Sequence, residues 1–88
     1  EIIRRLTELC EAAKPETTGF EWLTHEVNYQ RFPQSLVVTL VFNDEVSEHT
    51  LVKEFSTLVP KVQNALAPVI GHQLPAKQIE ARREHSVH

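Results

Sequence analysis

The sequence predicts an α+β domain in the order α-β-β-α-β, with a three-stranded, mainly antiparallel sheet and two helices packed on one of its faces. Three observations predict this class. Apolar residues recur at helical spacing near the start of the chain and again through its middle. Two segments rich in aromatic and β-branched residues lie between these helical stretches. The length of 88 residues leaves room for one domain, spanning residues 1–88.

Residues 2–13 are predicted to form the first helix. Their apolar side chains, including Ile2, Leu6 and Leu9, keep the three-and-four spacing of one buried stripe. We expect the helix to end at Lys14, because the following proline disfavours helical geometry in the residue before it. Cys10 lies on the stripe and is interpreted as a small buried hydrophobic residue, since no activating base is evident beside it.

Two strands are predicted next, over residues 20–29 and 36–42. The connection at residues 30–35 contains Pro33, which argues against one continuous strand. The second strand is predicted to be central, because it is apolar on both faces. In the first strand, period-two alternation divides the side chains into two faces, one with Phe20, Trp22, Thr24 and Glu26, the other with Leu23, His25, Val27 and Tyr29.

The second helix is predicted to start within residues 43–47, which supply oxygen-bearing caps and carboxylates suited to a helix N-terminus. Apolar spacing then continues from Leu51 to Ile70. Pro60 interrupts this stretch, so we expect a kink there, or two helices that meet close to it. Pro68 and Gly71 are expected to end the helix.

Residues 76–85 are predicted to form a third strand at an edge of the sheet. Charged side chains here would discourage aggregation through that edge. A helix is the alternative interpretation of this segment. The last residues, 86–88, are expected to be frayed.

Composition excludes several classes of protein. A net charge of -3 argues against non-specific binding to a phosphate backbone. No apolar stretch is long enough for a membrane span, and the start of the chain lacks the pattern of a secretory signal, so a cytoplasmic location is expected. The chain contains no Met, so we expect it to be a fragment, a processed form or a chain with further N-terminal residues. The histidines lack metal-ligand spacing and no glycine-rich phosphate loop is present, so we predict no metal, cofactor or catalytic residues and do not expect an enzyme.

The apolar residues on both faces of the second strand lead to a binding hypothesis. Two helices can cover one face of the sheet, so something else should cover the other. We expect a second copy of the chain or another protein to do so. The alternative is cover from the chain's own loops or from further N-terminal residues. The residues predicted to lie near this surface are Trp22, His25, Tyr29, Val37, Thr39 and Val41.

The run Gly-Phe-Glu-Trp-Leu-Thr-His at residues 19–25, with Val-Asn-Tyr at 27–29, Phe-Pro at 32–33 and Ser-Leu at 35–36, resembles a group of small uncharacterised bacterial proteins. The similarity is clearest over residues 19–42. Some members are labelled Fis-like transcriptional regulators, and the resemblance implies no established activity. Fis proteins are helical and read DNA through a helix-turn-helix, whereas two strands are predicted here.

The element order alone resembles the second type of KH domain and BolA proteins, which act as partner-binding regulators. The KH resemblance implies an alternative function, binding of RNA or DNA. KH domains hold the nucleic-acid backbone with a GXXG loop between two helices. The corresponding stretch here, residues 57–60, has no glycine. The candidate phosphate contacts would be Arg4, Arg5, Lys77, Arg82 and Arg83.

Overall fold

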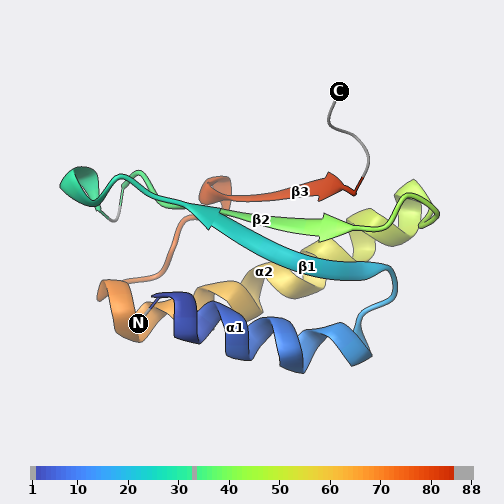
Figure 1. Cartoon of the computed structure of the whole chain (residues 1–88), viewed down its shortest axis with the longest axis horizontal. Coiled ribbons are helices and arrows are strands. Elements are labelled where there is room, and N and C mark those ends of the chain that lie inside the picture. Colours follow the sequence, from blue (N-terminus) through green and yellow to red (C-terminus); the bar gives the residue numbers. More distant parts are fainter. Residues whose placement is uncertain (1, 33, 85–88) are drawn as a thin grey trace.

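The computed structural model of the protein describes residues 2–32 and 34–84. Two helices lie on one side of a three-stranded sheet, and Figure 1 shows the two layers one above the other. The α+β class and the order α-β-β-α-β are therefore confirmed. The elements are α1 (Ile2–Ala13), β1 (Phe20–Glu26), β2 (Val37–Phe42), α2 (Glu48–Ile70) and β3 (Ile79–Arg83), with short 3-10 helices η1 (Lys14–Glu16), η2 (Tyr29–Arg31) and η3 (Ala76–Gln78).

The helix α1 has the predicted bounds and buries the predicted stripe. Ile2, Leu6 and Ala13 are buried, and Leu9 and Cys10 pack partly against the same core. The α-helix gives way to the 3-10 helix η1 at Lys14, because the following Pro15 has no backbone N–H with which to continue the α-helix.

A β-bulge near the start of β1 changes the predicted alternation. Phe20 pairs with Phe42, but Trp22 pairs with Val41, so Glu21 is the extra residue. Because of this insertion, Phe20 is buried in the core, whereas Trp22 is exposed on the opposite face. The prediction that both aromatic side chains share a face is therefore wrong. The strand is also shorter than predicted, because Tyr29 lies in η2.

The sheet is mixed. β1 and β2 pair antiparallel, as predicted, but β2 and β3 pair parallel. The physical reason is the connection: α2 carries the chain back along the sheet before β3 begins, which is the crossover that a parallel pair requires. The description "mainly antiparallel" thus fits only the first pair. β3 is an edge strand, as predicted, and of its predicted range His85 lies outside the described residues.

The helix α2 is continuous and contains both Pro60 and Pro68. Two separate helices are therefore not formed, and Pro68 lies within the last turn rather than beyond it. The Ser47 side chain caps the N-terminus by accepting a hydrogen bond from the Thr50 backbone N–H at 3.1 Å. Gly71 ends the helix in the left-handed conformation, at φ 83°.

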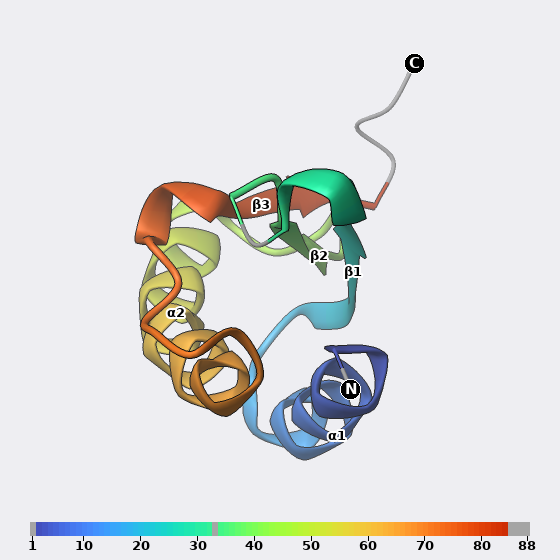
Figure 2. The same ribbon diagram turned by 90° about the vertical axis from the view of Figure 1, so that its left-hand side faces the viewer.

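The core lies between the sheet and the helices, as the view along the sheet in Figure 2 illustrates. From β2, alternate residues point into it, and α2 supplies a matching buried row. Phe20 and Phe42 meet edge to face, with ring centroids 5.8 Å apart. The buried residues from β2 and α2 are Val38, Leu40, Phe42, Leu58, Val62 and Leu66.

Hydrogen bonds to loop carbonyls hold the ends of β3. The Gln78 side chain donates from Nε2 to the carbonyl of Leu36 at 2.7 Å, at the beginning of the strand. At the other end, Arg83 Nη1 donates to the carbonyl of Val46 at 2.6 Å and to that of Asp44 at 3.3 Å. These contacts tie β3 to the loops before and after β2.

Candidate functional site

The face of the sheet that points away from the helices carries most of the residues predicted to lie at a partner-binding surface. We call it the outer sheet face. Neither helix lies on this side in Figures 1 and 2. The strand registers place eight residues on it, in cross-strand rows of Trp22, Val41 and Arg82, then Thr24, Thr39 and Glu80, then Glu26 and Val37.

Trp22 and Val41 form the apolar centre of the first row. Trp22 is 43% exposed, one of three large hydrophobic residues that the described part of the chain leaves in solvent. Val41 is only 1% exposed although it faces away from the main core. Its neighbours on the two adjacent strands are Trp22 and Arg82.

The described side chains of the connection between β1 and β2 are used elsewhere in the structure. Phe32, in this connection, packs against the core on the helix side of the sheet. Ser35 joins the end of the connection to its start. Its Oγ accepts a hydrogen bond from the Asn28 N–H at 2.8 Å and donates one to the Asn28 carbonyl at 2.9 Å. The Phe32 side chain therefore contributes to the core, and the Ser35 hydroxyl forms hydrogen bonds within the connection.

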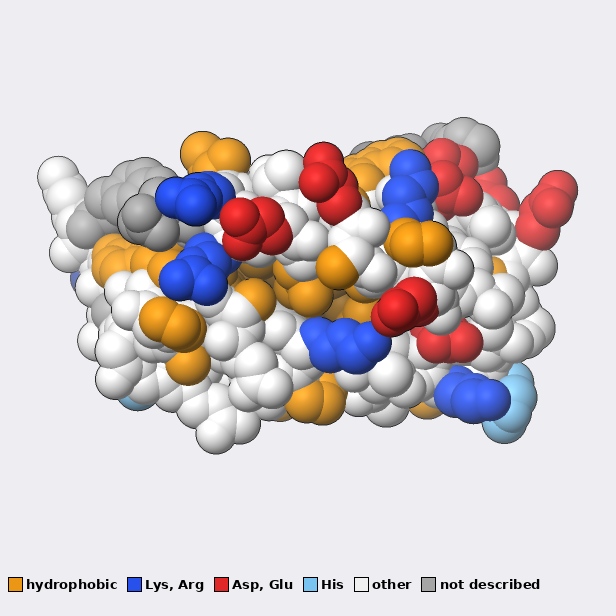
Figure 3. All heavy atoms as spheres, turned by 90° about the horizontal axis from the view of Figure 1, so that it is seen from below, with side chains coloured by type: hydrophobic (Ala, Val, Ile, Leu, Met, Phe, Trp, Pro, Cys, Tyr) orange, Lys and Arg blue, Asp and Glu red, His pale blue; other side chains and the backbone are white. Residues whose placement is uncertain are grey.

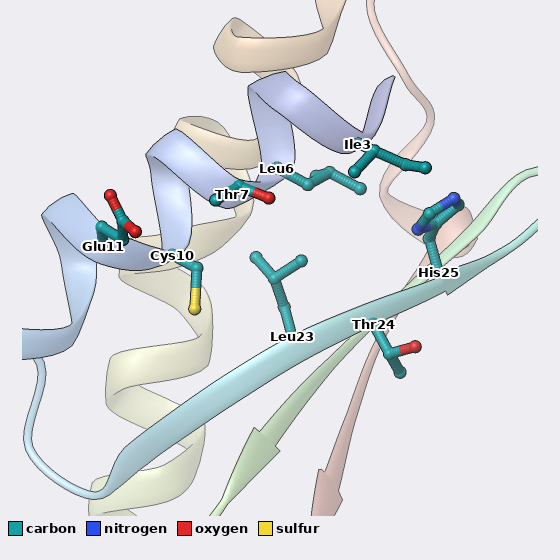
Figure 4. Close-up of a pocket in the computed structure, with 8 residues that line it drawn as sticks. All are labelled: Ile3, Leu6, Thr7, Cys10, Glu11, Leu23, Thr24 and His25. Atoms are coloured by element: carbon teal, nitrogen blue, oxygen red, sulfur yellow. The ribbon is translucent and has the colours of Figure 1, made fainter. Parts of the chain in front are cut away.

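The predicted partner residues are divided by the structure. Val37, Thr39 and Val41 share the outer sheet face through the alternation along β2, and Trp22 joins them because it pairs with Val41. His25 points to the other side, toward α1 (Figure 4). The side chain of Tyr29 lies outside the described part of the structure.

A second candidate surface was not predicted from the sequence. It is a pocket of about 330 Å³ between α1 and the free edge of β1, and we call it the edge groove. In Figure 4, Leu23 and His25 point from β1 toward α1, whereas Thr24 points away from it. The residues that line the edge groove are Ile3, Leu6, Thr7, Cys10, Glu11, Leu23, Thr24 and His25.

The sequence could not reveal the edge groove because it depends on strand order. The sheet order is β1-β2-β3, so no strand among the described residues lies beside the outer edge of β1. Ile3, which lines the groove, is 65% exposed. A single exposed apolar side chain is common on protein surfaces, so Ile3 alone could not have indicated the groove.

The cations proposed for nucleic-acid binding do not form one patch. Arg4 and Arg5 lie on α1, in the helix layer, whereas Arg82 lies on the outer sheet face. Arg4 also approaches Glu8, with Nε and Oε2 3.5 Å apart. Arg83 is used to hold the loop at residues 43–46. Since α2 is continuous, the helix break in which a KH domain places its loop is not formed.

Charged side chains of both signs are scattered over the helix side of the molecule, and Figure 3 shows several of them around an apolar strip. One salt bridge on this side joins Lys61 of α2 to Glu16 of η1, with Nζ and Oε1 3.7 Å apart. Within residues 2–32 and 34–84, no three His, Cys, Asp or Glu side chains gather closely enough to hold a metal ion. The described helices also include none that is long and apolar enough to cross a membrane.

Comparison of the chain with family models, with curated proteins and with solved structures finds no match, so the function must be argued from the two surfaces themselves.

Proposed function

We propose that this protein is an interaction domain that self-associates through its outer sheet face. The observation that carries the proposal is Trp22, a tryptophan 43% exposed on a sheet face that no described element covers. Tryptophan contributes more binding energy at protein interfaces than most residues, because it buries a large, rigid surface. Val37 and Thr39 extend the half-buried surface along β2.

The outer sheet face also has the charge arrangement of an interface. Its centre is uncharged, and its charged residues, Glu26, Glu80 and Arg82, lie on the two flanking strands. A neutral centre with a charged rim is the usual organisation of a protein interface. This arrangement favours a protein partner over a nucleic acid, since two of the three rim charges would repel phosphate.

A second copy fits this face for a geometric reason. Trp22 and Arg82 stand on opposite sides of Val41 in one cross-strand row. A two-fold axis running along β2 would place each Trp22 over the Arg82 of the other copy. An arginine over the face of a tryptophan ring is a favourable cation–π contact, and the symmetry would form it twice.

The proposal is tested by the molar mass in solution at micromolar to high micromolar concentration, measured by sedimentation equilibrium. We expect a dimer that Trp22→Arg weakens by at least about 2 kcal/mol, because the substitution removes the central aromatic side chain. Thr24→Arg should weaken it as well, by placing a charge beside Thr39 in the uncharged middle of the face. A strictly monomeric wild-type protein would contradict the proposal.

The matched control is Val52→Arg. Val52 is 55% exposed, like Trp22 a large hydrophobic residue in solvent, but it lies on α2. We expect the dimer to be unaffected by this variant. Circular dichroism of all three variants separates loss of association from loss of folding.

A further inference from the structure

We infer that the edge groove binds an extended peptide segment with alternating apolar side chains and flanking lysine or arginine residues, added as a fourth strand beside β1. The edge groove is formed by α1 and the helix-facing side chains of β1, and it adjoins the outer sheet face at Thr24 and Glu26. Molar mass reports self-association and amide shifts report peptide binding, so failure of one proposal can be distinguished from failure of the other.

The backbone of β1 has hydrogen-bonding groups directed toward this edge. The Asn43 N–H donates to the Gly19 carbonyl at 2.8 Å, and the Glu84 N–H donates to the Phe42 carbonyl at 2.7 Å. Peptide groups of successive strand residues point in alternate directions, so those of Val41 and Thr39 point toward β1. Their partners Trp22 and Thr24 are thereby engaged with β2, which leaves the peptide groups of Leu23 and His25 directed toward the open edge.

The same two residues supply side chains to the edge groove. Leu23 and His25 are half-buried and point toward α1, and Ile3 and Leu6 line the opposite wall (Figure 4). A strand added beside β1 would form backbone hydrogen bonds with Leu23 and His25 and would place every second side chain in the groove. This is the β-augmentation mode of peptide recognition, in which the backbone provides affinity and the pockets provide specificity.

The carboxylates around the edge groove indicate a peptide that carries positive charge. Glu11 lines the groove, and Glu21 and Glu26 bracket Leu23 and His25 along β1. No Lys or Arg occurs in β1. Carboxylates along the edge favour a cationic segment and disfavour a nucleic acid, whose phosphates they would repel. They also disfavour a second copy, because two β1 edges would bring four of these carboxylates together.

The experiment is a titration of isotope-labelled protein with acetyl-Lys-Val-Thr-Val-Thr-Val-Lys-amide, followed by NMR. We expect the largest shifts at the Leu23 and His25 amides and at the Ile3 methyl groups. A peptide with glutamate in place of both lysines should bind at least about fivefold more weakly, since two attractive charge contacts become repulsive. A peptide with N-methylated valines should not bind, because its N–H groups are lost.

Charge reversal in the protein provides the matched comparison. The double variant Glu21→Lys/Glu26→Lys should reverse the preference between the two peptides. Glu80→Lys, which changes an exposed carboxylate on the outer sheet face, should leave the preference unchanged. The inference is overturned if the cationic peptide causes no shifts at millimolar concentration, if the shifts fall on the outer sheet face, or if the acidic peptide binds equally well.

Discussion

Gly19 shows how one residue fixes the start of β1. Its φ of 82° lies in the left-handed region, which side-chain-bearing residues adopt only at a cost. A Cβ at this position would also lie 2.9 Å from the Cβ of Val46. Val46 is part of the core, so it has little freedom to move away.

Gly19→Ala is therefore expected to lower the free energy of unfolding by about 2–4 kcal/mol, since backbone strain and overpacking add. Gly71→Ala is the matched control, because Gly71 has the same left-handed conformation, at φ 83°, with open space around it. Its expected cost is about 1–2 kcal/mol, from strain alone. Chemical denaturation measures both values, and equal losses would contradict the packing argument.

At the scale of single residues, the sequence predicted the candidate site only in part. Val37, Thr39 and Val41 could be assigned to one face because β2 is regular. Phe20 was assigned to the same face as Trp22, because the position of a bulge depends on tertiary packing and is not visible in the alternation along the strand. Once Glu21 is recognised as the extra residue, the burial of Phe20 and the exposure of Trp22 both follow.

At the scale of elements, α2 is the largest single contributor to the helix layer. It contains Pro60 in its middle, although proline removes a backbone hydrogen bond and crowds the preceding turn. The buried row of Leu58, Val62 and Leu66 continues past this position. Packing of the apolar face against the sheet thus outweighs the local cost of the proline.

Replacing Pro60 by alanine should raise the free energy of unfolding by about 2 kcal/mol. A proline in a helix interior costs about 3 kcal/mol relative to alanine, and its loss makes the unfolded chain more flexible by up to about 1 kcal/mol. Pro60 is exposed, so no core contact is lost. Thermal and urea unfolding provide the measurement.

Pro75→Ala is the control for this prediction. Pro75 lies outside the α-helices, at φ -61°, a value that suits proline. Here the change should only increase the freedom of the unfolded chain and lower stability by up to about 1 kcal/mol. A loss of stability in Pro60→Ala would show that the proline is better accommodated than its position in α2 indicates.

The elements themselves were largely predictable, and their pairing was less so. Apolar spacing identified α1 with its observed bounds, because Pro15 marks its end clearly. The parallel direction of β3 was not predicted, since direction depends on how α2 crosses the sheet and not on the residues of β3. The edge groove was missed for the same reason, because it exists only where β1 is outermost.

At the scale of the whole molecule, charge is dispersed. Arg4 and Arg5 lie in the helix layer, Lys77 in η3 and Arg82 on the outer sheet face. Tight, salt-sensitive binding to nucleic acid requires several cations that contact consecutive phosphates. The separation of these side chains does not provide such a track.

We therefore expect no complex with a fluorescein-labelled single-stranded RNA or DNA oligonucleotide at ~50 mM salt, as measured by a gel shift. The same titration with Arg82→Glu should be indistinguishable from wild type. Binding that tightens steeply as the salt concentration falls would support a nucleic-acid function instead.

The mixed sheet has a consequence for how the chain folds. β1 and β2 are neighbours in sequence and can meet early, whereas the pairing of Val38 with Ile79 requires α2 to be in place first. We expect β3 to join last, and until it does both edges of the two-stranded sheet remain unprotected. The contacts from Arg83 to the loop at residues 43–46 then have a second role, because by holding β3 in place they keep one of those edges paired.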